Sequence, residues 1–129
     1  MAMLLLRVNT VLGQSYIMTN GSTITTCSGT FYDPGGPDSN YHKNLNVTQT
    51  IMPATPGGCV QVTFISFVTE ANRDLLTVYD GTSASGFPIG AYSGTDSNFT
   101  VTSYTGALTF VFTSDGSVQK AGWEAAYKP

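Results

Sequence analysis

Three acidic residues, Glu70, Asp74 and Asp115, stand at the ends of apolar runs, in the stretches FVTEANRDLLTVYDG (67–81) and FTSDGS (112–117). Carboxylates that are held close together need a counter-charge, and Ca2+ takes about six to eight oxygen ligands from carboxylates, backbone carbonyls and water. We therefore predict that the three acids converge on a calcium site at one end of a β-fold. The alternative is that they are solvated loop acids in Asx turns, or that one of them pairs with Arg73.

The residues for catalysis are sparse. The chain has one histidine, His42, in a polar loop beside a lysine, and no Gly-x-Ser-x-Gly sequence, so a Ser-His-Asp triad has no support. Paired carboxylates such as Glu70 and Asp74 could cleave a glycoside, but only within a cleft that a domain of 129 residues has little chain to build. We predict that the protein is not an enzyme.

The composition indicates the fold that must position the acids. Hydrophobic residues make up 41% of the chain and charged residues 10%, and Gly or Pro interrupts every apolar run before a helical period develops. Short alternating runs, separated by turn residues, predict strands. These runs are Val47–Met52, Val60–Phe64, Leu75–Tyr79, Ile89–Tyr92, Phe99–Tyr104, Leu108–Thr113 and Trp123–Lys128. We expect one all-β domain, an antiparallel two-sheet sandwich or jelly roll.

The charge distribution excludes one class of partner. The formal net charge is -3, and the five basic residues are scattered along the chain. Binding to a phosphate backbone requires a concentrated basic surface. Nucleic acid is therefore not an expected partner.

The two cysteines and three sequons bear on the compartment. Cys27 and Cys59 lack the spacing and the histidines of a zinc site, so they either form a disulfide or are two buried thiols. A disulfide would indicate an oxidising compartment. Possible glycosylation sites at Asn20, Asn46 and Asn98 agree with an extracellular location.

The first residues allow two interpretations. We divide the chain into an N-terminal extension, residues 1–22, and a β-sandwich, residues 23–129. The apolar run Met3–Leu6 resembles the tail of a secretory leader and is too short to span a membrane. It equally suits a strand, which would pair with its own sheet or with the open edge of a neighbouring copy.

From Cys27 to Tyr127 the sequence resembles the CUB domain family. The matching pieces are the turn-rich stretch Gly29–Tyr41, the pattern Val60, Val62, Phe64, Phe67, Glu70, the pair Asp74-Leu75, the run Val78–Gly81, then Ile89-Gly90 with Tyr92 and Gly94, Phe112 with Ser114-Asp115 and Ser117, and Gly122-Trp123 with Ala125. Within the family the chain looks most similar to secreted or cell-surface modules of Bacteroidetes-like bacteria. The resemblance implies an extracellular β-sandwich of two antiparallel sheets.

The resemblance also implies a function and its residues. In calcium-binding members the matching positions are Glu70, Asp74 and Asp115, with a backbone carbonyl near Ser117, and the ordered acidic loops receive a basic side chain from a protein partner. The four-cysteine pattern usual in animal members does not match here, because the turn Ala71–Arg73 has no cysteine. A bridge between Cys27 and Cys59 therefore does not follow from the family.

We accordingly expect a non-enzymatic extracellular module, stabilised by calcium, that makes protein contacts. Self-assembly into a filament through the N-terminal strand is part of this hypothesis. The alternative is a monomeric glycan-binding adhesion module, in which Tyr41, Tyr92 or Tyr104 stacks on sugar instead of packing in the core.

Overall fold

The computed structural model describes residues 14–26, 28–55, 57–96 and 98–128. Within these ranges the chain forms strands and turns without a helix. The strands are β1 (Ser15–Ile17), β2 (Ser22–Thr26), β3 (Gly29–Tyr32), β4 (Asn46–Pro53), β5 (Gln61–Val68), β6 (Leu75–Asp80), β7 (Phe87–Tyr92), β8 (Thr95–Asp96), β9 (Phe99–Thr102), β10 (Leu108–Thr113) and β11 (Gly122–Lys128). In the described part of the chain, no helix has the length and apolar character needed to cross a membrane.

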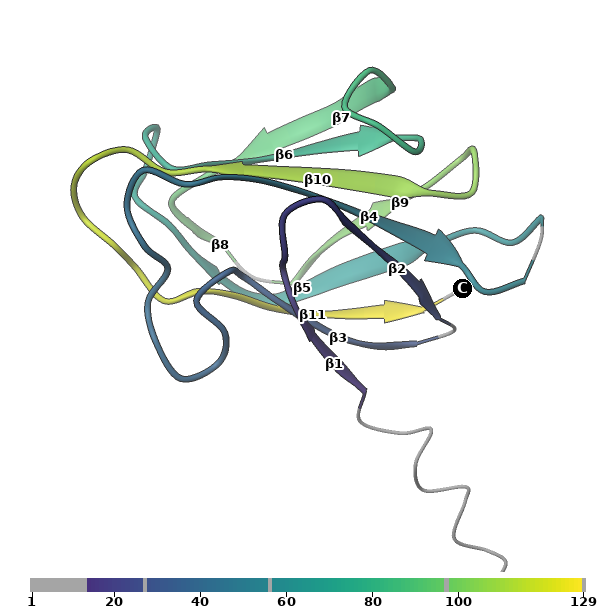
Figure 1. The fold of residues 1–129 in the computed structure, drawn as a ribbon, viewed down its shortest axis with the longest axis horizontal. Helices are drawn as coiled ribbons and strands as arrows, with labels where there is room; N and C mark the ends of the chain where they lie inside the picture. The colour runs from purple at the N-terminus through teal and green to yellow at the C-terminus, as the bar shows by residue number, and fades with distance from the viewer. Residues whose placement is uncertain (1–13, 27, 56, 97, 129) are drawn as a thin grey trace, which may run out of the picture.

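The strands form two facing sheets, which confirms the predicted sandwich (Figure 1). One sheet has the order β1-β3-β11-β5-β8, with β9 also paired to β5, and the other has the order β2-β4-β10-β6-β7. The sheets are mixed and not wholly antiparallel, because β1 pairs in parallel with β3 and β2 pairs in parallel with β4. The physical reason is that the chain crosses from one sheet to the other between these partners, and a crossover connection permits parallel pairing where a tight hairpin does not.

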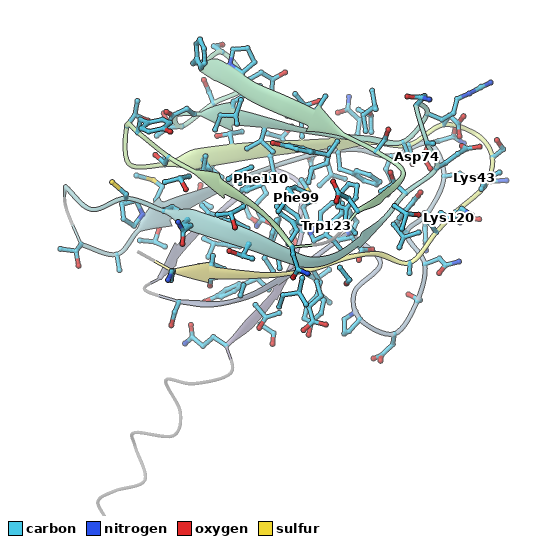
Figure 2. All side chains as sticks on the ribbon, turned by 180° about the vertical axis from the view of Figure 1, so that it is seen from behind. Lys43, Asp74, Phe99, Phe110, Lys120 and Trp123 are labelled. Carbon is cyan, nitrogen blue, oxygen red and sulfur yellow. The ribbon has the colours of Figure 1, made fainter. Side chains whose placement is uncertain are left out.

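The core lies between the sheets and follows the predicted alternation. Leu108, Phe110 and Phe112 on β10 are fully buried. The ring of Trp123 on β11 stacks on Phe67 with centroids 5.9 Å apart and meets Phe112 edge-on at 5.1 Å. Figure 2 shows Phe99, Phe110 and Trp123 between the two sheets. Tight aromatic packing at the ends of β5, β10 and β11 gives the loops that follow these strands a rigid base.

Part of the predicted N-terminal extension belongs to the sandwich. Strand β1 pairs with β3 of the same chain, and Met18 is buried in the core. Ser22 begins β2 opposite Gln49. Residues 1–13 lie outside the described residues, so the leader and the donated strand stay predictions.

The sandwich has two ends with different loops. Strands β6 and β10 run antiparallel, with Thr113 opposite Leu75 at one end and Leu108 opposite Asp80 at the other. We call the first the acidic end; it carries the loops 69–74 and 114–121. We call the second the pocket end; it carries the loops 54–60, 81–86 and 103–107. Strand β6 runs from one end to the other in 6 residues, and at a rise of about 3.4 Å per residue its first and last residues lie about 17 Å apart.

Candidate functional site

The acidic end brings together the three predicted acids. Glu70 and Asp74 lie in the loop that leads from β5 in one sheet to β6 in the other, and Asp115 follows β10, whose last residue is paired with the first residue of β6. One carboxylate oxygen from each of Glu70, Asp74 and Asp115 lies within 4.8 Å of the others. Figure 2 shows Asp74 at this end of the molecule, near the labelled Lys43 and Lys120. The predicted convergence is therefore observed.

Asp74 is the most tightly held of the three. Its side chain is fully buried. One carboxylate oxygen accepts a hydrogen bond of 2.6 Å from the Tyr41 hydroxyl, and the other accepts one of 2.9 Å from the Asp115 N–H. The Thr69 hydroxyl donates to the Asp74 carbonyl at 2.9 Å. Asp74 therefore ties the loop after β10 to the loop after β5.

Tyr41 holds the Asp74 carboxylate in place from the hydrophobic core. It is fully buried, and its ring meets Phe112 edge-on with centroids 4.9 Å apart. Its hydroxyl also accepts a 3.2 Å hydrogen bond from the Glu70 N–H. Burial raises the pKa of Tyr41, and the hydrogen bond to Asp74 raises it further, so the hydroxyl stays a donor to the carboxylate.

Glu70, unlike Asp74, is not fully satisfied by hydrogen bonds from the described residues. Its Oε1 atom is buried and has no hydrogen-bond partner among the described residues. Burial raises the pKa of Glu70, the carboxylates of Asp115 and Asp74 raise it further, and Arg73 opposes them. A buried carboxylate oxygen without a donor is costly, and a cation or a proton between the carboxylates would satisfy it. Three carboxylates and no soft donor form a ligand set that fits Ca2+.

Asp115 has both neighbours that the solvated-loop alternative predicted. Arg73 lies 3.8 Å from its Oδ2 atom, and the N–H of Ser117 donates to Oδ1 at 3.1 Å, which forms an Asx turn. The Arg73 side chain is 69% exposed, so this ion pair contributes less than about 1 kcal/mol. Ser117 is exposed and orients Asp115, and its role as a carbonyl ligand stays a prediction.

Of the three tyrosines considered for sugar stacking, only one has a free face. Tyr41 is a core residue, and Tyr92 stacks on Phe99 with centroids 4.6 Å apart. Tyr104 is 87% exposed and lies at the pocket end, away from the acids. The sequence pattern could not separate these cases, because Tyr92 and Tyr104 both end alternating runs and Tyr41 ends a turn-rich stretch.

Asp33 is a buried carboxylate whose role the sequence did not reveal. In the sequence Asp33 stands directly before Pro34-Gly35-Gly36, a position typical of a turn residue. Its side chain is 1% exposed and accepts hydrogen bonds from the N–H of Gly35 at 2.9 Å and the N–H of Trp123 at 3.1 Å. It therefore anchors the start of β11 in addition to its own turn. The distant partner has no local signal in the sequence.

We predict a pH dependence of folding stability from Asp33. Burial raises its pKa from 3.8 to about 6, against the hydrogen bonds from Gly35 and Trp123, which lower it. Because the folded-state pKa is the higher one, the stabilisation is complete below pH 3.8 and is lost as the pH rises through about 6. Between pH 5 and 7 the loss amounts to about 1 kcal/mol.

The Asp33→Asn variant isolates this contribution. Urea unfolding in chelator at several pH values should show that the fall in stability from pH 5 to 7 is smaller in Asp33→Asn than in the native protein. Asp38→Asn, at an exposed position two residues after Gly36, is the control and should keep the native slope. Identical slopes in the two variants would contradict the assignment.

The cysteine and sequon predictions remain open. Cys59 is exposed and has a free thiol, whereas Cys27 lies outside the described residues. The structure therefore gives the Cys27–Cys59 bridge no support, and the pairing stays a prediction. Asn20, Asn46 and Asn98 are all exposed, as glycosylation requires, and their modification stays a prediction.

Comparison with known proteins identifies the family. The model of the CUB domain matches residues 20–127. The chain is 32% identical over 118 residues to cubilin of Homo sapiens, covering 82% of this chain and 3% of cubilin. It is 34% identical over 113 residues to neuropilin-2 of Rattus norvegicus, covering 80% of this chain and 12% of neuropilin-2. The chain thus spans a small part of these relatives.

Solved structures agree on the fold. The full extracellular region of zebrafish Gpr126/Adgrg6 has 29% sequence identity and a TM-score of 0.73, covering 85% of this chain and 14% of that one. The CUB2 domain of MASP-1 bound to Ca2+ has 24% identity and a TM-score of 0.71, covering 85% of this chain and 99% of that domain. These relatives are animal proteins or domains, so the expected similarity to bacterial modules has no support. The chain belongs to the CUB domain family.

Proposed function

We propose that this chain is a non-enzymatic extracellular interaction module that binds Ca2+ at its acidic end and a basic side chain of a protein partner beside the ion. The observation that carries the proposal is the buried Oε1 atom of Glu70, which has no partner among the described residues and lies in a cluster of three carboxylates. The Ca2+-bound CUB2 domain of MASP-1, which has the same fold, supports the choice of ion.

The ion would connect loops that belong to different sheets. Glu70 follows β5 in one sheet, whereas Asp115 follows β10 in the other. Tyr41 and the Asp115 N–H already orient Asp74 for such a role. Because the carboxylates are preorganised, Ca2+ binding would order the loop tips at little conformational cost.

The charge balance supports a basic partner group. Three ionised carboxylates around one divalent cation leave one negative charge in excess. A lysine or arginine side chain from another protein would neutralise it and would donate hydrogen bonds to the outer carboxylate oxygens. The chain's own Arg73, 3.8 Å from Asp115 and 69% exposed, offsets this charge only weakly and shows that a guanidinium can lie beside the cluster.

Calcium should stabilise the native protein, and Glu70→Gln should abolish the effect. An ion that binds only the folded state, present at a concentration a hundred times its Kd, stabilises the folded protein by about 2.7 kcal/mol. In a domain of this size such a stabilisation raises the Tm by about 10 °C. Without calcium, Glu70→Gln should melt at or above the native Tm, because it removes repulsion from the neighbouring carboxylates. Thermal melts with calcium and with chelator measure both effects.

The matched control is Glu124→Gln, which removes the same charge from an exposed position on β11. It should keep the calcium-dependent rise in Tm. If the native protein melts at one temperature with calcium and with chelator, the calcium proposal fails. The partner group is tested separately with an array of lysine- and arginine-containing peptides, which should bind only in calcium, whereas glutamate-substituted copies should not.

A further inference from the structure

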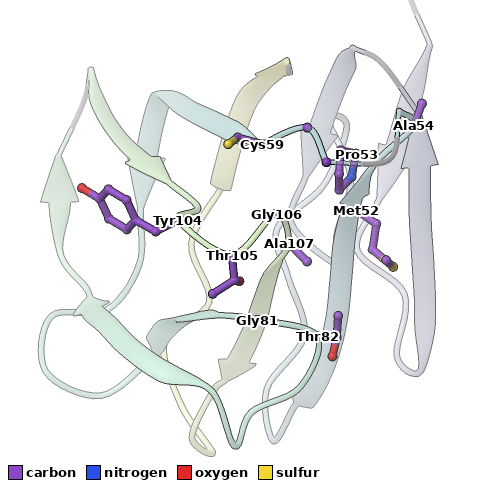
Figure 3. Close-up of a pocket in the computed structure, with 12 residues that line it drawn as sticks. Met52, Pro53, Ala54, Cys59, Gly81, Thr82, Tyr104, Thr105, Gly106 and Ala107 are labelled. Carbon is purple, nitrogen blue, oxygen red and sulfur yellow. The ribbon is translucent and has the colours of Figure 1, made fainter.

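The pocket end carries a cavity that the proposed function does not use. It has a volume of about 620 Å3, within the range of about 300–1,000 Å3 that small-molecule sites occupy. Figure 3 shows Met52 and Pro53 on one side, Tyr104 on the other, and Gly106 and Ala107 between them. Its loops join strands at the end of the sandwich opposite Glu70, Asp74 and Asp115.

The cavity exists because its lining residues are small. Half of the twelve lining residues are glycine or alanine, namely Ala54, Gly57, Gly58, Gly81, Gly106 and Ala107. Gly106 has a φ of +117°, and a Cβ there would lie 3.3 Å from the Gly58 carbonyl oxygen, so a side chain at this position is disfavoured by both backbone conformation and space. The loop that carries Gly58 and the loop that carries Gly106 therefore approach each other closely without filling the space between them.

A buried carboxylate keeps the wall of the cavity in place. Asp80 is 7% exposed and accepts hydrogen bonds from the Tyr104 N–H at 3.0 Å, and from the Thr105 hydroxyl and N–H at 2.7 and 3.2 Å. Burial opposes the ionisation of Asp80, but these bonds and one from Ser103 outweigh it and lower its pKa. Backbone bonds join the loops to each other, with Ser103 N–H donating to the Val60 carbonyl and Gly81 N–H to the Ala107 carbonyl, each at 2.9 Å. The cavity is therefore largely preformed.

The electrostatic character of the cavity selects the occupant. The segments 44–69, 81–95 and 97–114, which supply all the lining residues, contain no charged residue. The carboxylate of Asp80, which lies behind the wall, has both oxygens occupied by the hydrogen bonds from Ser103, Tyr104 and Thr105. An ionic ligand would lose its hydration without a counter-charge, whereas a neutral apolar ligand would bury surface against Met52, Pro53 and Ala107.

We propose that the pocket end is a second binding site, for a neutral and mostly apolar small molecule. The ligand lies among Met52, Pro53, Cys59 and Ala107, with Thr82 at the rim. The site is independent of calcium, because none of its lining residues belongs to the acidic end. The domain therefore has two chemically opposite ends, one for a cation with a basic group and one for an uncharged apolar molecule.

The neutral dye Nile red tests the site. The native protein should bind one equivalent saturably, with the same affinity in calcium and in chelator. Neutral 2-naphthol should displace the dye at a concentration at least tenfold below that needed with naphthalene-2-sulfonate. No saturable binding, or equal competition by the two naphthalenes, would overturn the proposal.

Two variants locate the binding. Thr82→Trp places a large side chain over the rim and should weaken dye binding at least tenfold. Thr95→Trp makes the same change at an exposed position near the acidic end and should leave the affinity unchanged. If Thr82→Trp and Thr95→Trp bind the dye as the native protein does, the dye binds elsewhere and the proposal is wrong. Thr82 and Thr95 are exposed, so both variants should fold, and an unchanged Tm checks this.

Discussion

Asp74→Ala is expected to destabilise the domain by about 3 kcal/mol in chelator and to abolish calcium binding. The Asp74 carboxylate is fully buried and accepts hydrogen bonds from the Tyr41 hydroxyl and the Asp115 N–H. Its removal leaves two donors without a partner, each at a cost of about 1 to 3 kcal/mol. It also disconnects the loop after β10 from the loop after β5, so Glu70 and Asp115 no longer share one position. Urea unfolding measures the first effect and calcium titration calorimetry the second.

Asp38→Ala is the control variant for Asp74→Ala. Asp38 is exposed in the same long connection that carries Tyr41, and its substitution should change stability by less than about 0.5 kcal/mol and leave calcium binding intact. Glu70→Gln provides the second comparison, because it should abolish calcium binding without the loss of stability in chelator. Equal stability of Asp74→Ala and Asp38→Ala would mean that the two loops do not depend on the buried carboxylate.

Gly122→Ala is expected to be at least as damaging, by about 3 kcal/mol or more. Gly122 has a φ of +80°, and a Cβ there would lie 2.1 Å from the Cγ of Asp33. Alanine in the left-handed region costs about 1 to 2 kcal/mol by itself. The Asp33 side chain cannot move aside freely, because it is buried and holds the N–H groups of Gly35 and Trp123. The clash therefore adds a second cost of about 1 to 3 kcal/mol from overpacking.

Gly21→Ala separates the two costs. Gly21 has a φ of +79°, and a Cβ at that position would have no atom within 4 Å. Its substitution should cost only the conformational part, about 1 to 2 kcal/mol. Equal destabilisation by Gly21→Ala and Gly122→Ala in urea unfolding would show that Asp33 yields to the added methyl group, and that its contact with the start of β11 is not a rigid one.

Strands β4 to β7 and β9 to β11 were predictable because their signal is local, whereas β1, β2, β3 and β8 are not among the predicted runs. Alternation of apolar and polar residues over a few positions, as in Leu108–Thr113, is enough to define a strand and its inward face, and the structure confirms both. The parallel pairing of β1 with β3 and of β2 with β4 was not predictable. Strands β1 and β2 are short edge strands whose partners are set by the path of the chain between the sheets, which no short sequence pattern records.

The candidate site, like the fold, was predictable only in part from the sequence. Acids at the ends of strands were recognisable, and antiparallel pairing of β6 with β10 brings Asp74 and Asp115 to one end. Their unequal environments were not recognisable. The full burial of Asp74 depends on Tyr41, which lies 33 positions away along the chain, and the exposure of Tyr104 depends on how the loop 103–107 is held by Asp80.

By itself, the sequence determined the all-β class, the inward faces of the strands and the residues from which an acidic cluster could form, because each of these depends on neighbours a few positions apart. Only the tertiary structure decided which carboxylates are buried, that Asp33 anchors the start of β11, and that small residues from three loops enclose an uncharged cavity. These features arise from groups distant along the chain, whose burial and hydrogen bonding exist only once the two sheets have packed together.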